Sequence, residues 1–122
     1  MKRDWELIRK ILVVTEAQPP HTAPTIEEIA GNEWKRDVVV AHVRLLTEAG
    51  YINARILTGL GNDLDQAVII GITMHGYDLL EHLRSDTVWG KIKSIAKDKG
   101  VDLSFEAVKL IAPMAIKALL GN

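Results

Sequence analysis

The sequence contains no cysteine among its 122 residues, and aromatic residues make up only 5% of it. The absence of cysteine excludes disulfides, thiolate nucleophiles and cysteine metal sites. Lys and Arg number 15 and Asp and Glu 16, so there is no basic excess of the kind expected of a nucleic-acid-coating domain. No long uninterrupted apolar run and no basic-then-apolar leader occurs. We therefore expect a cytoplasmic protein with no membrane partner.

What the chain does have is apolar residues, which make up 48% of it. That content supports one cooperative core at this length, but not two ordinary domains. We therefore expect a single domain over residues 1–122, made of a unit at 1–85 and a helical extension at 86–122. The clearest linker is the proline-rich stretch QPPHTAP, residues 18–24.

Capping residues and apolar spacing predict three helices before residue 50. Asp4 is placed to cap a helix that ends near Glu16 and whose inward stripe is Trp5, Ile8, Ile11, Leu12 and Thr15. Thr25 is placed to cap a short helix over residues 26–30. A turn containing Trp34 follows. Its ring either plugs the angle between the two neighbouring helices, which we favour, or stays partly exposed beside Arg36. A third helix runs from about Asp37 to Gly50.

Two strands and another helix follow. Residues 51–57 and 67–72 are rich in β-branched and apolar side chains, and the turn-forming stretch GLGND, residues 59–63, lies between them. Thr73 is placed to cap a helix that carries Leu79, Leu80 and Leu83.

The order of these elements over residues 25–80 resembles that of winged-helix regulators. The phrases that carry the resemblance are Ile29-Ala30, EAGYI at 48–52 and ITMHGYDLL at 72–80. The resemblance implies an α+β fold, namely a winged helix-turn-helix with a two-stranded wing and two additional C-terminal helices.

A narrower resemblance lies at the start of the chain. MKRDWELIRKIL, residues 1–12, resembles the opening of an uncharacterised family of bacterial and phage proteins, a domain of unknown function. Its members share a His-x-x-Leu-Leu-x-x-Ala-Gly phrase, which is matched here by residues 42–50. The resemblance implies a phage or prophage protein with a regulatory or interaction role.

Double-stranded DNA is one candidate partner of the predicted helix 37–50. Base edges are read by hydrogen bonds and phosphates are held by cations, and the candidate contacts are Lys35, Arg36, Arg44 and Arg55. Against this, the predicted wing carries Asp63 and Asp65 and no Lys or Arg.

A protein partner is the alternative, with the winged-helix scaffold used as an interaction module that binds no DNA. We expect Val40, Ala41 and Leu45 to face outward from the same helix, and this apolar surface suits a protein interface better than a DNA groove.

Two further helices are predicted after Ser85, one ending at Gly100 and one running from Ser104 to Leu120. The last helix has an apolar stripe that needs covering: Phe105, Val108, Ile111, Ala115 and Leu119. The stripe can be buried by folding back on the winged helix or by pairing with a second copy. The winged-helix resemblance implies the homodimer.

We expect no enzyme activity and no cofactor. His75, Asp78 and His82 lie on one side of a predicted helix and are the best candidates for a metal site, but this pattern is also that of an ordinary solvated flank. Glycine-rich phosphate loops, nucleophile elbows and paired catalytic carboxylates do not occur in the sequence.

Overall fold

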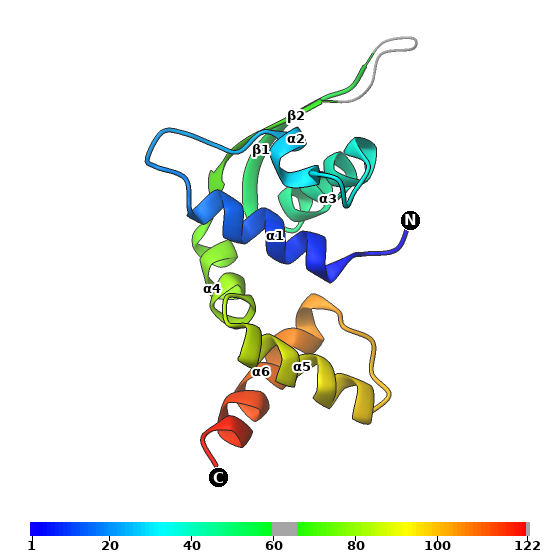
Figure 1. Cartoon of the computed structure of the whole chain (residues 1–122), viewed down its shortest axis with the longest axis vertical. Coiled ribbons are helices and arrows are strands. Elements are labelled where there is room, and N and C mark those ends of the chain that lie inside the picture. Colours follow the sequence, from blue (N-terminus) through cyan, green and yellow to red (C-terminus); the bar gives the residue numbers. More distant parts are fainter. Residues whose placement is uncertain (60–65, 122) are drawn as a thin grey trace. The chain divides into compact units, whose positions relative to one another are not determined.

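The computed structural model describes residues 1–59 and 66–121 (Figure 1). Its elements, in chain order, are α1 (Trp5–Glu16), α2 (Ile26–Ala30), α3 (Arg36–Glu48), β1 (Ile52–Leu57), β2 (Gln66–Ile72), α4 (Met74–Leu83), α5 (Asp86–Asp98) and α6 (Phe105–Leu119). The α+β class is confirmed, because this part of the chain forms six helices and a two-stranded antiparallel sheet. Residues 60–65 lie outside the described residues. They include all but the first residue of the predicted turn at 59–63, and both acidic residues of the predicted wing, Asp63 and Asp65.

Side-chain caps set where most of the helices begin, and they include the three predicted at Asp4, Thr25 and Thr73. In each case a side-chain oxygen accepts a hydrogen bond from a backbone N–H in the first turn, which satisfies a donor that has no partner within the helix. The capping residues are Asp4 for α1, Thr25 for α2, Thr73 for α4, Ser85 for α5 and Ser104 for α6. These caps act locally, so the predicted and observed bounds agree within about two residues.

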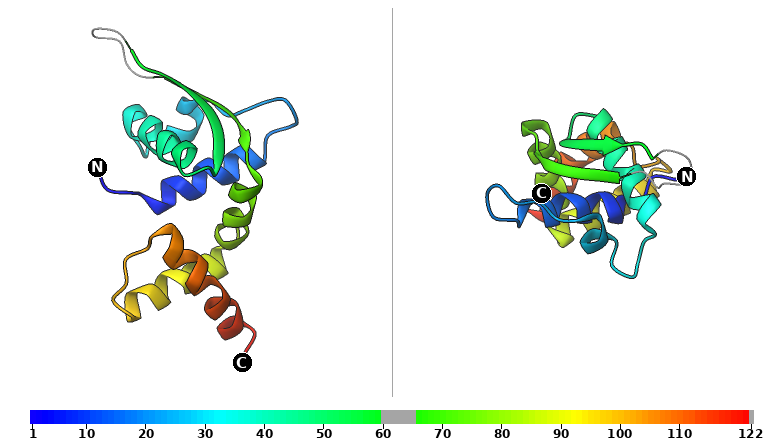
Figure 2. Two further views of the ribbon diagram at one scale, coloured as in Figure 1. Left: turned by 180° about the vertical axis from the view of Figure 1, so that it is seen from behind. Right: turned by 90° about the horizontal axis from the view of Figure 1, so that it is seen from above.

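The chain divides into two compact units, Met1–Tyr77 and Asp78–Asn122, and α4 spans the boundary between them. In the first unit, α1 packs on α2, α3 and β2, and α3 packs on α2 and both strands. Figure 2 shows the strand pair beside these helices. The predicted stripe of α1 is buried except for Trp5, which is half-buried, and Leu7 joins it.

The strands pair in an antiparallel ladder from Ile52 opposite Ile72 to Leu57 opposite Gln66. The register shifts between Asn53 and Ala54, so Ile70 has no partner in the ladder. Successive side chains of a strand point to opposite faces. Ile52 and Ile69 are buried, whereas Arg55 and Val68, directly opposite each other, are exposed.

In the second unit, α5 packs against α6. The buried side chains of this pair are Trp89, Ile92 and Ala96 from α5 and Ala107, Val108, Ile111, Ala112 and Ala115 from α6. Over residues 1–59 and 66–121, no helix is both long and apolar enough to cross a membrane.

Candidate functional site

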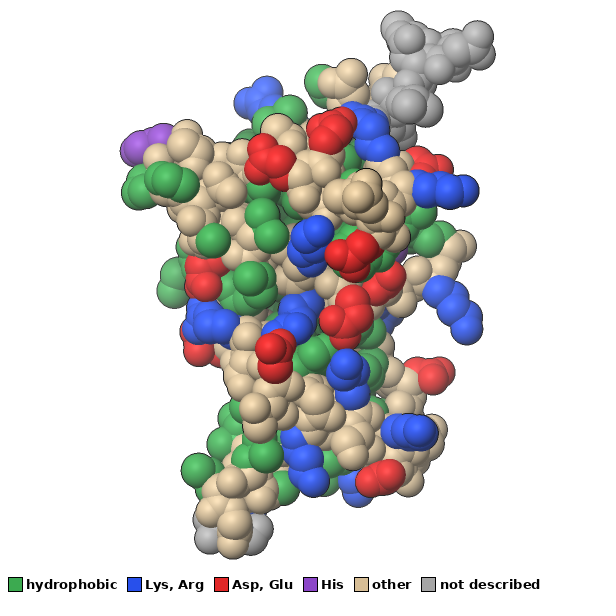
Figure 3. Space-filling view, in the orientation of Figure 1, with side chains coloured by type: hydrophobic (Ala, Val, Ile, Leu, Met, Phe, Trp, Pro, Cys, Tyr) green, Lys and Arg blue, Asp and Glu red, His purple; other side chains and the backbone are tan. Residues whose placement is uncertain are grey.

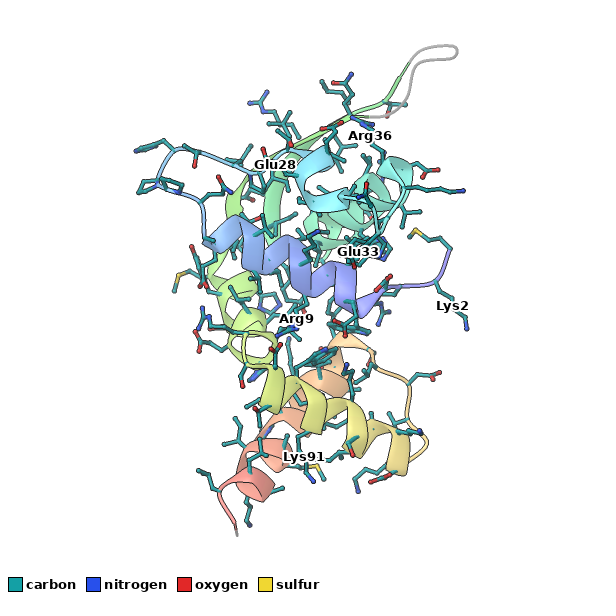
Figure 4. All side chains as sticks on the ribbon, viewed as in Figure 1. Lys2, Arg9, Glu28, Glu33, Arg36 and Lys91 are labelled. Carbon is teal, nitrogen blue, oxygen red and sulfur yellow. The ribbon has the colours of Figure 1, made fainter. Side chains whose placement is uncertain are left out.

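The start of α3 is tied to α2 by an ion pair. Nε of Arg36 lies 3.0 Å from Oε1 of Glu27, and the arginine side chain is partly covered, whereas that of Glu27 is exposed. A hydrogen bond from its own backbone N–H and the bond from Arg36 hold the pKa of Glu27 below its ordinary value. Figure 4 shows Arg36 where α3 begins. One of the predicted DNA contacts is therefore engaged with a carboxylate of its own chain.

A groove of about 1110 Å³ lies next to this ion pair. Its walls come from the segment before α2 and the first turn of α2, from Arg36, and from the ends of both strands: Ala23, Pro24, Thr25, Ile26, Glu27, Leu57, Thr58, Gly59, Gln66, Ala67, Val68 and Ile69. The lining is mixed: apolar side chains alternate with the ion pair and with the polar groups of Thr25, Thr58 and Gln66. Such a groove suits a peptide segment, which brings both apolar side chains and polar backbone groups.

One face of the strand pair exposes three large apolar side chains, beside the polar Asn53 and Gln66. Leu57, Val68 and Ile70 expose 59%, 55% and 59% of their surfaces, and with Arg55 they make up what we call the outer hairpin face. The sequence contains a signal for it, because Val68, Ile69 and Ile70 are consecutive and must include both faces of the strand. Leu57, Val68 and Ile70 are not among the site residues predicted from the sequence.

The other predicted DNA contacts are dispersed over the first unit. Lys35 and Arg55 are exposed, and Arg44 is half-buried. Arg55 belongs to the outer hairpin face, whereas Lys35 and Arg44 belong to the α3 region. Figure 3 shows acidic and basic side chains interspersed over the face that it displays, without a continuous basic field.

The prediction that Val40 faces outward is wrong, because this side chain is only 4% exposed. The reason is that α3 has neighbours on several sides, since it contacts α1, α2 and both strands. Its buried arc is therefore wider than one stripe and includes Val39, Val40, His42, Val43 and Leu46. Ala41 and Leu45 are half-buried, so α3 offers little apolar surface to a partner.

A polar cluster joins α1 to α3. The backbone N–H of Asp4 donates to Nε2 of His42 at 2.9 Å, and Nδ1 of the same ring lies 2.8 Å from the carbonyl oxygen of Val38. Because a carbonyl can only accept, Nδ1 carries the proton and Nε2 is the acceptor. His42 is completely buried, so its role here is structural.

Trp34 belongs to the same cluster. The indole Nε1 donates to Oδ2 of Asp4, and the ring lies 5.2 Å from Nζ of Lys10. Partial burial raises the pKa of Asp4, but hydrogen bonds from Trp34, Leu7 and Glu6 outweigh it, so the pKa is below its ordinary value. Trp34 is half-buried and connects the turn before α3 to the start of α1.

The metal candidates do not assemble into a site. The ring of His75 stacks on Tyr51, with centroids 4.5 Å apart. Within residues 1–59 and 66–121, no group of three or more His, Cys, Asp or Glu side chains is placed to hold a metal ion.

The predicted stripe of the last helix is largely covered. Val108, Ile111 and Ala115 are buried, Phe105 is half-buried and Leu119 is exposed. The packing partner of α6 in its unit is α5, which neither of the two expected arrangements included. The prediction that Val108, Ile111 and Ala115 form a protein interface is therefore wrong, because these three side chains belong to the core.

Comparison with known proteins places the chain in a family. No solved structure matches it. An uncharacterized protein of Haemophilus influenzae (strain Rd) is 34% identical over 121 residues, which cover 99% of this chain and 100% of that protein. Residues 2–102 match the family described as Hypothetical protein (DUF2513), and the expectation of an uncharacterised family is thereby confirmed. The chain belongs to the DUF2513 family.

Proposed function

We propose that the chain is a winged-helix protein whose first unit binds another protein through the outer hairpin face. The observation that carries this proposal is the exposure of Leu57, Val68 and Ile70 on one face of the strand pair. Apolar side chains that are exposed together on one face mark interaction sites, whereas single apolar side chains scattered over a surface are normal. The winged-helix assignment is supported by the order α2, α3, β1, β2 and α4.

The chemistry of the partner follows from the charge beside the apolar side chains. Arg55 pairs with Val68 across the ladder and is the charged member of this face. A partner that presents apolar side chains next to a carboxylate is therefore complementary. The adjoining groove, which Leu57 and Val68 also line, offers room for one of the partner's apolar side chains.

The charges near α3 favour a protein over DNA. Residues 26–48 carry five carboxylates and three cations: Glu27, Glu28, Glu33, Asp37 and Glu48 against Lys35, Arg36 and Arg44. Phosphate binding relies on cations that replace condensed counterions, and a surplus of carboxylates opposes it. The ion pair with Glu27 further reduces what Arg36 can offer to a phosphate.

DNA binding is the second candidate, and one observation favours it. Lys35 is exposed immediately before α3, and Arg36 follows it at the edge of the groove. With Arg44 and Arg55, these cations would be the contacts of a transcriptional regulator, in a phage or prophage setting as the family resemblance implies. Neither candidate function includes catalysis.

The two candidates are separated by measuring fluorescence anisotropy with mixed-sequence duplex DNA at ~50 and ~200 mM salt. We expect no salt-sensitive binding. Binding at the lower salt that is lost in Arg36→Ala and Arg44→Ala would overturn the proposal in favour of the regulator.

The protein partner is tested by cross-linking capture with wild-type protein and two variants. Val68→Glu places a charge on the outer hairpin face and should abolish capture of the partner. Val13→Glu is the matched control, because Val13 is also exposed but belongs to α1. A captured protein that both variants retain equally does not use this face and would contradict the proposal.

A further inference from the structure

Helix α6 exposes large apolar side chains on the side that does not pack against α5. Leu110 and Met114 expose 73% and 44% of their surfaces, and Ile116 and Leu120 are exposed as well. Large apolar side chains that are exposed together on one side of a helix mark an interaction surface. Within its described unit, however, only the buried arc around Val108 and Ala115 is covered. The exposed side therefore calls for a partner.

Charged and apolar residues follow a regular spacing on that side. Glu106, Leu110, Pro113 and Lys117 are separated by four, three and four residues, so they lie along one side of the helix. We call them, with Met114, the outward face of α6. An acid marks its first turn and a base marks its last turn, and the apolar residues lie between them. All five of these side chains are exposed.

This pattern is complementary to itself when reversed. If a two-fold axis crosses the helix between Ile111 and Ala112, residue 106 of one copy lies opposite residue 117 of the other. The same axis sets residue 110 opposite residue 113. Glu106 then meets Lys117, and Leu110 meets the ring of Pro113, twice each in the pair. A two-fold interface requires this kind of self-complementary surface.

We propose that the outward face of α6 binds a second copy of this chain, with the two α6 helices antiparallel. The complementary charges at the two ends select another α6 over a lipid surface, which offers no matching pattern of acid and base. Glu106 also lies 3.8 Å from Lys109 of its own helix, a long and exposed pair that leaves the carboxylate accessible. The interface belongs to the second unit and does not depend on the outer hairpin face.

Sedimentation of the full chain tests the proposal directly. At high protein concentration we expect a mass of twice the 13.5 kDa of one chain. On dilution, this mass should fall to that of a single chain. Leu110→Glu should give the single-chain mass at all concentrations. Val101→Glu is the control, because Val101 is exposed but precedes α6. A wild-type protein that sediments as a single chain at every concentration would overturn the proposal.

Charge reversal tests the antiparallel direction. Glu106→Lys sets two lysines together and Lys117→Glu sets two carboxylates together, so each should weaken the dimer. The double variant restores both pairs and should restore the dimer. In a parallel pair each residue would meet its own copy, and the double variant would give no such rescue.

Cross-linking covers the case in which a charge variant fails to fold. Because the chain has no cysteine, one introduced thiol per chain gives an unambiguous product. In the antiparallel pair, residue 110 of one copy is offset from residue 110 of the other by about 4.5 Å along the axis, and the two copies of residue 106 by about 16 Å. Leu110→Cys should therefore form a disulfide dimer on mild oxidation, and Glu106→Cys should not. Equal cross-linking at both positions would overturn the antiparallel arrangement, and none at either would overturn the interface.

Discussion

The indole Nε1 of Trp34 donates a 2.8 Å hydrogen bond to Oδ2 of Asp4, across 30 positions of the sequence. The other carboxylate oxygen, Oδ1, accepts from the backbone N–H groups of Glu6 and Leu7 at the start of α1. One carboxylate thus caps α1 and holds the turn between α2 and α3. The backbone N–H of Asp4 adds a third link, to His42 in α3.

Replacing Trp34 with Phe should destabilise the protein. The hydrogen bond is to an ionised group, and such bonds contribute about 1.5–3 kcal/mol. Urea unfolding of Trp34→Phe, Asp4→Ala and the double variant forms a double-mutant cycle that isolates the coupling. Strictly additive losses would show that the indole and the carboxylate do not interact in solution.

The stability supplied by Asp4 should depend on pH. Its pKa is below the ordinary 3.8 in the folded chain, so folding favours the ionised form. The contribution is therefore fully present above about pH 4 and lost as the pH falls through the lower folded value. We expect the difference in free energy of unfolding between wild type and Asp4→Asn to shrink over that range. A difference that stays constant from pH 6 down to about 2.5 would contradict the inferred direction of the shift.

Removing the acceptor at His42 should also destabilise the fold. In His42→Leu the partly buried N–H of Asp4 loses its partner, and leaving such a donor unsatisfied costs up to about 1–3 kcal/mol. His42→Gln places an amide oxygen about as far from the backbone as Nε2, so it keeps an acceptor for this N–H and should lose less. Chemical unfolding of both variants provides the comparison, and equal losses would show that packing alone explains the effect.

The helix starts could be predicted because their causes are local. Asp4, Thr25, Thr73 and Ser85 each bond to a backbone N–H two or three residues away, so a short window of sequence contains the whole interaction. The same applies to the strand pair, whose β-branched runs flank a turn-forming stretch.

The candidate surfaces could not be predicted in this way. The burial of Val40 depends on neighbours of α3 that are distant in sequence, and so does the pairing of Trp34 with Asp4. The apolar spacing of α6 predicts that its stripe needs cover, but spacing alone does not reveal that α5 covers it and leaves Leu110 exposed. The apolar period of a helix shows that a face is buried, not what buries it.

Two glycines in helices should respond oppositely to replacement with alanine. Gly76 lies in the first turn of α4, and a Cβ there would overlap the backbone carbonyl of Tyr51 and crowd Ile72. The same carbonyl accepts a hydrogen bond from the N–H of Thr73, so it cannot withdraw without cost. Gly90 lies in α5, is exposed, and has nothing within 4 Å of the equivalent position.

Gly76→Ala should therefore lower the free energy of unfolding by roughly 1–3 kcal/mol, the usual effect of overpacking, despite the better helix propensity of alanine. Gly90→Ala should raise it by up to about 1 kcal/mol, because only the propensity changes. Thermal and urea unfolding of the two variants beside wild type measures both effects. If Gly76→Ala were as stable as Gly90→Ala, α4 would not approach Tyr51 as closely as the structure has it.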